Sequence, residues 1–139
     1  MFRITNNRQI RLALAVAAAW TLAGCPKPYG HRRLEGDCPQ AAEVRDMLKV
    51  LRERGESGLP KTLRESAASG LDASQTQALQ AALKELIQAD SAELARIDRF
   101  GSNVYRATFR VSRDAKTTDA ALLLVTGDGG RLRWAGPNT

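Results

Sequence analysis

The stretch Val104-Tyr105-Arg106-Ala107-Thr108-Phe109-Arg110-Val111-Ser112 alternates between two kinds of side chain. One set is apolar or aromatic and begins at Tyr105, and the other set includes the arginines Arg106 and Arg110. Successive side chains of a strand point to opposite faces of a sheet. The pattern therefore predicts a strand with one apolar face, which needs a cover, and one arginine-rich face.

The residues on both sides of this stretch predict an antiparallel sheet of about four strands. Residues 93–99 form the preceding strand, and Gly101-Ser102-Asn103 is the turn between the two. After a polar loop over residues 113–119, the run 120–126 (AALLLVT) is apolar on both faces, as expected of a well-covered central strand. Residues 127–130 (GDGG) turn the chain into a last strand, Arg131-Leu132-Arg133-Trp134. Short turns between successive strands predict a meander.

Helical patterns precede the strands and predict the cover. The segment from Pro39 to Arg54 has apolar residues at i, i+3, i+4 and i+7, a capping residue at Asp37 or Cys38, and Gly55 at its end. A short second helix is expected over residues 61–68, with Gly70 as its C-terminal cap. Asp72 and Gln75 form the pattern of a capping box, which starts a third helix running through residue 90.

These patterns predict an α+β fold in which N-terminal helices pack on a C-terminal antiparallel sheet. The order of elements over about residues 38–135 resembles the cystatin-like or nuclear-transport-factor-2-like architecture. The resemblance implies a cone-shaped pocket that holds a ligand or, in enzymatic members, an aspartate-histidine pair. The single histidine, His31, lies ahead of this region. The alternative is a small module of secretion-system lipoproteins, in which strands and helices are interleaved.

Residues 1–24 have the three-part layout of a secretory signal. The first eleven residues carry Arg3, Arg8 and Arg11 without an acid, and the next eleven (LALAVAAAWTL) are apolar. As a helix the apolar run is about 17 Å long, against a bilayer core of about 30 Å. The segment is therefore expected to direct export instead of spanning a membrane. The alternative is a short buried helix of the folded domain.

The next residues, Leu22-Ala23-Gly24-Cys25, resemble the lipobox of bacterial lipoproteins. The resemblance implies cleavage between Gly24 and Cys25, a lipid on the sulfur of Cys25 and an acylated new amino group. Pro26, in place of the aspartate associated with the inner membrane, implies the periplasmic face of the outer membrane. Two or more acyl chains anchor a protein stably. Without lipid, Cys25 and Cys38 could instead form a disulfide.

Composition limits the choice of partner. The formal net charge is +6, and removing the three arginines of the signal leaves +3, so the sequence predicts no nucleic-acid partner.

The expected organisation is a signal over residues 1–24, an anchor and linker over 25–37, one domain over 38–136 and a tail over 137–139. Cys38 is either a reactive thiol at a helix N-terminus or an inert, partly buried one.

The arginines of the sheet are the candidate partner-binding residues. If Arg106, Arg110, Arg131 and Arg133 share a face, they form a basic patch for an acidic protein or another polyanion; alternatively they only keep the sheet surface solvated. No catalytic set, metal-ligand set or cofactor motif is found. The sequence thus favours a lipid-anchored binding or assembly module of the cell envelope over an enzyme. Alternatives are a small-ligand or glycan-binding lipoprotein and an inhibitor or immunity lipoprotein.

Overall fold

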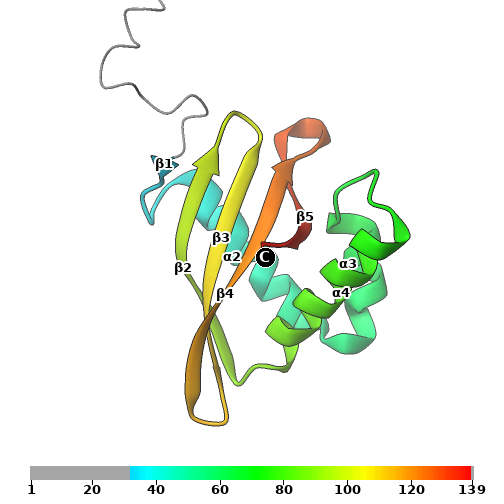
Figure 1. Ribbon diagram of the computed structural model, residues 1–139, viewed down its shortest axis with the longest axis vertical. Coiled ribbons are helices and arrows are strands. Elements are labelled where there is room, and N and C mark those ends of the chain that lie inside the picture. Colours follow the sequence, from blue (N-terminus) through cyan, green and yellow to red (C-terminus); the bar gives the residue numbers. More distant parts are fainter. Residues whose placement is uncertain (1–31, 139) are drawn as a thin grey trace, which may run out of the picture. The chain divides into compact units, whose positions relative to one another are not determined.

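The computed structural model describes residues 32–138, which form an α+β fold with three α-helices against one sheet (Figure 1). The helices are α2 (Pro39–Arg54), α3 (Leu59–Ser66) and α4 (Ala73–Gln88). The sheet contains β1 (Arg32–Arg33), β2 (Ser91–Phe100), β3 (Val104–Arg113), β4 (Lys116–Thr126) and β5 (Leu132–Pro137). Its strand order is β1-β2-β3-β4-β5, with antiparallel neighbours throughout, so the predicted helices-on-meander fold is confirmed.

The capping residues of α2 and α4 act as the sequence predicts. The Sγ atom of Cys38 accepts a hydrogen bond from the backbone N–H of Ala41 at 3.3 Å, and Gly55, at φ +69°, ends α2. At the start of α4, the Asp72 carboxylate accepts from the Gln75 N–H at 2.7 Å, and the Gln75 side chain accepts from the Asp72 N–H at 2.9 Å. The α4 helix ends at Gln88, two residues before the expected end.

The expected C-terminal cap of the second helix, Gly70, is wrong. The α3 helix ends at Ser66, and the next residue, Ala67, is extended (φ −86°, ψ 152°). Ala67 makes a parallel bridge with Trp134, and the N–H of Ala68 donates to the Trp134 carbonyl at 2.8 Å. The chain leaves the helix early because these residues pair with β5, and in doing so they cover that edge of the sheet.

The polar loop expected over residues 113–119 is also wrong. Asp114 and Ala115, both at positive φ (52° and 66°), form a two-residue turn, and β4 starts directly at Lys116. Two positive φ values suit the right-handed twist of a hairpin. The first four residues of β4 are exposed, because this end of the hairpin projects beyond the helices and its polar side chains stay in water (Figure 1).

Two further segments join the sheet beyond the expected strands. Arg32 and Arg33, within the expected linker, pair with Arg99 and Asp98 of β2, so the sheet has five strands instead of about four. At the other edge, β5 reaches Pro137, within the expected tail. Both additions depend on pairing with distant strands, which local sequence patterns do not reveal.

The core lies between the sheet and the helices. Trp134, Phe109 and Leu124 of the sheet have no exposed surface, and they pack with Leu51 of α2 and Leu83 of α4. The opposite face of β4 is less covered than expected, because Leu123 and Val125 are only half-buried there. Within residues 32–138, no helix has the length and apolar character needed to cross a membrane.

Candidate functional site

The first of the predicted partner-binding residues, Arg106, is already bound within the sheet. Asp98 of β2 has no exposed surface, and its carboxylate accepts from Arg106 Nη2 at 3.4 Å. Arg96 holds the same carboxylate through Nε at 2.9 Å and Nη2 at 3.0 Å. The Arg106 guanidinium also lies 5.1 Å from the ring centre of Phe100. These contacts fix Arg106 against β2 and leave it less able to bind a partner.

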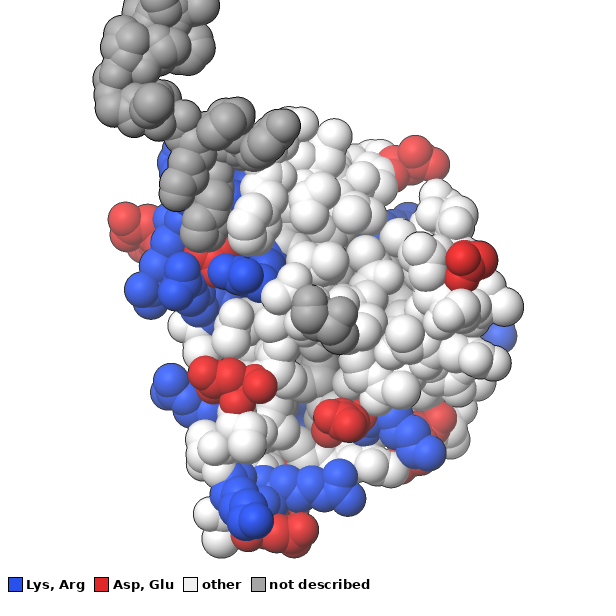
Figure 2. All heavy atoms as spheres, in the orientation of Figure 1, with Lys and Arg blue, Asp and Glu red and all other residues white. Residues whose placement is uncertain are grey.

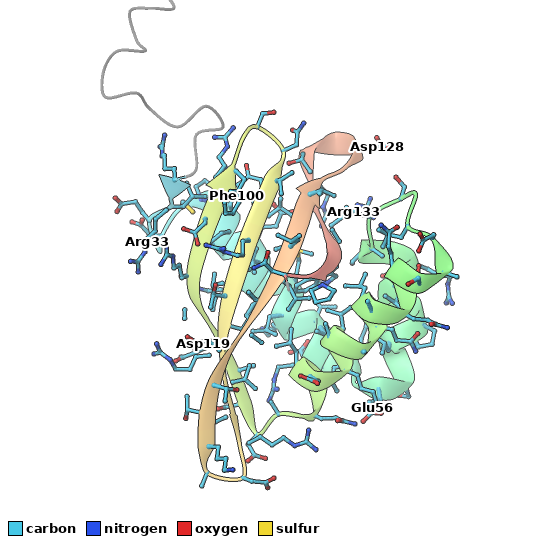
Figure 3. All side chains as sticks on the ribbon, in the orientation of Figure 1. Arg33, Glu56, Phe100, Asp119, Asp128 and Arg133 are labelled. Atoms are coloured by element: carbon cyan, nitrogen blue, oxygen red, sulfur yellow. The ribbon has the colours of Figure 1, made fainter. Side chains whose placement is uncertain are left out.

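The other three predicted arginines do not join Arg106 in one patch. Arg133 donates to the backbone carbonyl of Glu65 at the end of α3, well away from Phe100 in Figure 3. Arg131 is exposed and lines a hollow with Glu43 and Met47 of α2. Arg110 is exposed on β3, in register with Glu93 and Asp119, so acids flank it on both sides.

The register of the sheet brings a different set of arginines together. The pairing of β1 with β2, and of β2 with β3, places five of them around the buried Asp98: Arg32, Arg33, Arg96, Arg99 and Arg106. Figure 2 shows basic side chains gathered on this side of the molecule. We call this set the basic end. Sequence reasoning missed it because Arg32 and Arg33 were assigned to a linker.

A groove lies between α2 and the free part of β2. Its volume is about 590 Å³, and its apolar lining is formed by Leu48 of α2 with Ala92 and Leu94 of β2. Its charged lining consists of Arg45, Lys49, Arg52, Glu53 and Glu93. We call this feature the α2–β2 groove. A second hollow of about 360 Å³ adjoins it, because the two share Arg45 and Leu94 as lining residues.

The three cations of the α2–β2 groove form a stripe along one helix face. Arg45, Lys49 and Arg52 are spaced i, i+4 and i+7, which aligns them on α2. Among the described residues, none of the three lies within 4.0 Å of a carboxylate. This spacing is visible in the sequence. It was missed because only the apolar residues of the helix were examined for periodicity.

Two of these cations are held by backbone carbonyls. Arg52 Nη1 donates to Leu86 at 2.6 Å and to Ala89 at 3.2 Å, so its guanidinium satisfies the C-terminal carbonyls of α4. Arg45 donates to the carbonyl of Gly36. Lys49 is exposed and makes no ion pair within the part of the chain that the structure describes. The stripe thus combines two guanidinium groups held by backbone carbonyls with one exposed ammonium group.

Beside the groove, the edge of β2 that faces away from β3 has no neighbouring strand among residues 32–138. In residues 32–138, β1 pairs only with Asp98 and Arg99, and the N–H of Leu34 adds one bond to the Ile97 carbonyl at 2.9 Å. The N–H of Asp90 donates to Ser112 of β3 at 2.8 Å. Ser91 and Glu93 pair with Ser112 and Arg110, whose backbone groups face β2. The backbone groups of Ala92 and Leu94 therefore point away from β3, into the open edge.

The remaining predicted positions divide into two groups. Cys25, Gly24 and His31 lie outside the described residues, and the lipid site stays a prediction. Cys38 is half-buried, packs beside the core and uses its sulfur to cap α2, an arrangement that favours the structural interpretation of this thiol. Residues 32–138 hold no group of three or more His, Cys, Asp or Glu side chains placed to bind a metal ion.

Comparison with known proteins gives no further guide to the site. No protein-family model, curated protein or solved structure matches the chain significantly.

Proposed function

We propose that the chain is a lipid-anchored binding module of the cell envelope, held at the periplasmic face of the outer membrane, that engages a protein partner through the α2–β2 groove. One observation carries the assignment of the site. Within residues 32–138, an apolar-lined groove whose three cations have no carboxylate partner runs beside an edge of β2 that no further strand covers. Exposed strand edges and grooves beside helices are surfaces that proteins use to bind peptide segments.

The arrangement of the outer arginines supports the groove over the predicted sheet face. Arg106 is held by the buried carboxylate of Asp98, and Arg133, at the far edge of the sheet, donates to the Glu65 carbonyl, so these two arginines do not form one patch. In the groove, Lys49 is exposed and close to apolar surface. A surface that combines apolar area with unneutralised charge suits a protein partner.

The space between sheet and helices supports a binding module over a small-ligand carrier. The bulky side chains Trp134, Phe109 and Leu122 meet the helices there and have almost no exposed surface. A carrier of the kind implied by the cystatin-like resemblance needs that space for its ligand. The proposed partner therefore binds at the margin of the sheet, and the domain acts without a cofactor and without catalysing a reaction.

In the proposed arrangement, a lipid on Cys25 would lie closer along the chain to the basic end than to the groove. Arg32 follows Cys25 by seven residues, and a fully extended segment of that length spans at most about 25 Å. Because β1 is antiparallel to β2 and Arg32 pairs with Arg99, the chain enters the sheet near the Phe100 end. The groove lies toward the Ser91 end. The module would thus keep its basic end near the membrane and present the groove to the periplasm.

Site-specific crosslinking tests this function. A photoreactive amino acid at Lys49, in full-length protein expressed in its own membranes, is expected to crosslink one partner protein in good yield. The same group at Asp119, which is exposed on β4 outside the groove, is the matched control. Equal crosslinking at both positions, or none at Lys49, would contradict the proposal. The intact mass of the extracted protein should correspond to residues 25–139 plus lipid.

A further inference from the structure

One face of the sheet has no helix packed on it among residues 32–138. In β4, Leu122 and Leu124 belong to the buried core that the helices cover, and successive side chains of a strand point to opposite faces. Leu123 and Val125 therefore lie on the open face, where they are half-buried, and Val104, in register with Val125, is 36% exposed. We call Val104, Leu123 and Val125 the apolar strip. An exposed apolar surface that charged residues border is typical of a contact with a protein or a membrane.

Arginines of the basic end border the apolar strip. A row of cross-strand partners leads to it across four strands, in the order Arg33, Asp98, Arg106 and Leu123. Paired side chains of neighbouring strands share a face of the sheet, so this row lies on the open face. Arg96 joins the row, because its Nε donates to the Asp98 carboxylate at 2.9 Å. The open face thus places positive charge directly beside apolar surface.

Positive charge exceeds negative charge at this end of the sheet. Two acids lie among the five arginines of the basic end, namely the buried Asp98 and Glu35, which lines a hollow with Arg33. Three of the arginines donate to Asp98 or to the carbonyl of Gly101 in the β2–β3 turn. Arg32 and Arg33 are exposed and form no ion pair within the described part of the chain. These two are therefore the cations that an anion from outside can reach.

The same end of the sheet lies within reach of the proposed lipid site. Arg32 follows Cys25 by seven residues, and an extended segment of that length spans at most about 25 Å. β1 lies at the end of the sheet that carries the β2–β3 turn (Figure 1). Val104, the first residue of β3, directly follows that turn. A lipid on Cys25 would therefore hold both the arginines and the apolar strip close to a bilayer.

The chemistry of this surface fits an anionic bilayer better than a second copy of the chain. Guanidinium groups bind phosphate oxygens through paired, charge-assisted hydrogen bonds. Apolar side chains beside them can enter the boundary between headgroups and acyl chains. Two copies joined through this face would instead bring two arginine-rich ends into one interface, and like charges there repel.

We propose that the basic end and the apolar strip dock on an anionic bilayer, with Arg32 and Arg33 on lipid phosphates and Val104 at the acyl boundary. This inference rests on the proposed function, because the lipid on Cys25 keeps the surface near the membrane. The docking gives the domain a second contact with the bilayer. It also orients the domain, so that the Ser91 end of β2 and the α2–β2 groove beside it point away from the lipid.

A fluorescent reporter at Val104 tests the docking. An environment-sensitive fluorescent amino acid replaces Val104 in the full chain, and the protein is extracted from its own membranes and reconstituted into vesicles. In vesicles with equal parts of phosphatidylcholine and phosphatidylglycerol, the emission should shift to shorter wavelength, whereas vesicles of phosphatidylcholine alone should cause no shift. Raising the salt concentration should reverse the shift. The same reporter at Asp119, in the exposed part of β4, is the control and should show no shift.

Charge-reversal variants test the two arginines. Arg32→Glu together with Arg33→Glu should abolish the shift at Val104, because acids then face the lipid phosphates. The matched control combines Arg110→Glu with Lys61→Glu, which changes the net charge equally at two exposed positions outside the basic end. This control should keep the shift. Unchanged hydrogen exchange in β3 and β4 would verify that both double variants fold.

Several results would overturn the docking. They are no shift at Val104, equal shifts in the two kinds of vesicle, and equal shifts at Val104 and Asp119. A shift in detergent solution that grows with protein concentration would identify a second copy of the chain as the occupant. A Lys49 crosslink without the Val104 shift would reject the docking and leave the proposed function standing. The shift without the crosslink would support the docking and reject the groove as the partner site.

Discussion

Asp98 shows that a buried carboxylate can give nearby arginines a structural role that the sequence does not reveal. Its carboxylate is fully buried, and the side chains of Arg96 and Arg106 that hold it are 41% and 28% exposed. A buried carboxylate is stable only if charge-assisted hydrogen bonds replace its water. Arg106 therefore helps to solvate Asp98 and acts as a structural residue, although its alternation in β3 marks it as a surface cation.

The substitution Asp98→Asn tests this role. It removes the charge that two guanidinium groups contact, and we expect it to lower the free energy of unfolding by about 1–3 kcal/mol. The two arginines are partly exposed and can turn to water, which keeps the loss at the low end of what buried pairs show. Urea denaturation measures the effect. Asp119→Asn on the exposed part of β4 is the control and should change the free energy by less than about 0.5 kcal/mol.

Cys38 offers a second test at a single side chain. Its sulfur accepts the Ala41 N–H at 3.3 Å as the N-terminal cap of α2. Serine is a stronger cap, so Cys38→Ser should keep the stability within about 0.5 kcal/mol, and Cys38→Ala should lower it by about 0.5–2 kcal/mol. Thermal and urea unfolding measure both. Equal stability of the two variants, together with rapid thiol labelling of the native protein, would favour the reactive interpretation instead.

At the scale of elements, the sequence predicts structure well where the signal is local. The α2 helix begins and ends at the predicted residues because a capping residue, an apolar stripe and Gly55 all lie within one segment. The first four residues of β4 were missed because Lys116 to Asp119 are exposed and carry no alternation of apolar residues. β1 was missed because only pairing with β2 makes Arg32 and Arg33 a strand.

The candidate site, too, was predictable only where its signal is local in the sequence. The spacing of Arg45, Lys49 and Arg52 is a local signal and could have been found from the sequence. The open strand edge that the stripe faces could not be found from the sequence. It depends on where β1 stops pairing with β2, which is at Asp98. The predicted arginine patch failed for a related reason. Arg133 belongs to an edge strand whose side chain reaches α3, a contact between residues far apart in sequence.

The turn between β3 and β4 gives a prediction for an element. Ala115 adopts φ +66°, a left-handed conformation that costs a residue with a Cβ atom about 1–2 kcal/mol. Glycine removes this strain but gains entropy in the unfolded chain, so Ala115→Gly should raise the free energy of unfolding by up to about 1 kcal/mol. Ala121→Gly, in the extended part of β4, should lower it instead. If both variants lose stability, the two-residue turn is not the conformation in solution.

At the scale of the whole molecule, charge and apolar surface are arranged along β2. The basic end surrounds Asp98, where the chain enters the sheet, and the α2–β2 groove lies beside the Ser91 end. Under the proposed function, lipid on Cys25 would hold the basic end near the headgroups and leave the groove toward the periplasm. Clustered arginines near an anchor add to membrane attraction when the lipids are anionic. The two ends of one strand would then serve different contacts, one with the membrane and one with the partner.

This arrangement predicts that a substitution can abolish membrane anchoring without changing partner binding. Cys25→Ser removes the lipid site, and we expect the protein to move from the membrane fraction to a soluble one, because one headgroup contact is far weaker than acyl chains. Its unfolding temperature should not change, since the buried core cluster lies within residues 41–134. Its crosslinking to the partner through a photoreactive group at Lys49 should not change either, since the groove is formed by residues 45–53 and 92–94. Sedimentation of membranes, thermal unfolding and photocrosslinking at Lys49 measure the three properties. If the Cys25→Ser protein instead stays with the membranes, adding Arg32→Glu and Arg33→Glu would then test the basic end. If the added substitutions abolish the association, the basic end, not lipid, holds the protein at the bilayer. Loss of the Lys49 crosslink in soluble Cys25→Ser protein would instead show that the anchor contributes to partner binding, and would reject the separation of the two ends.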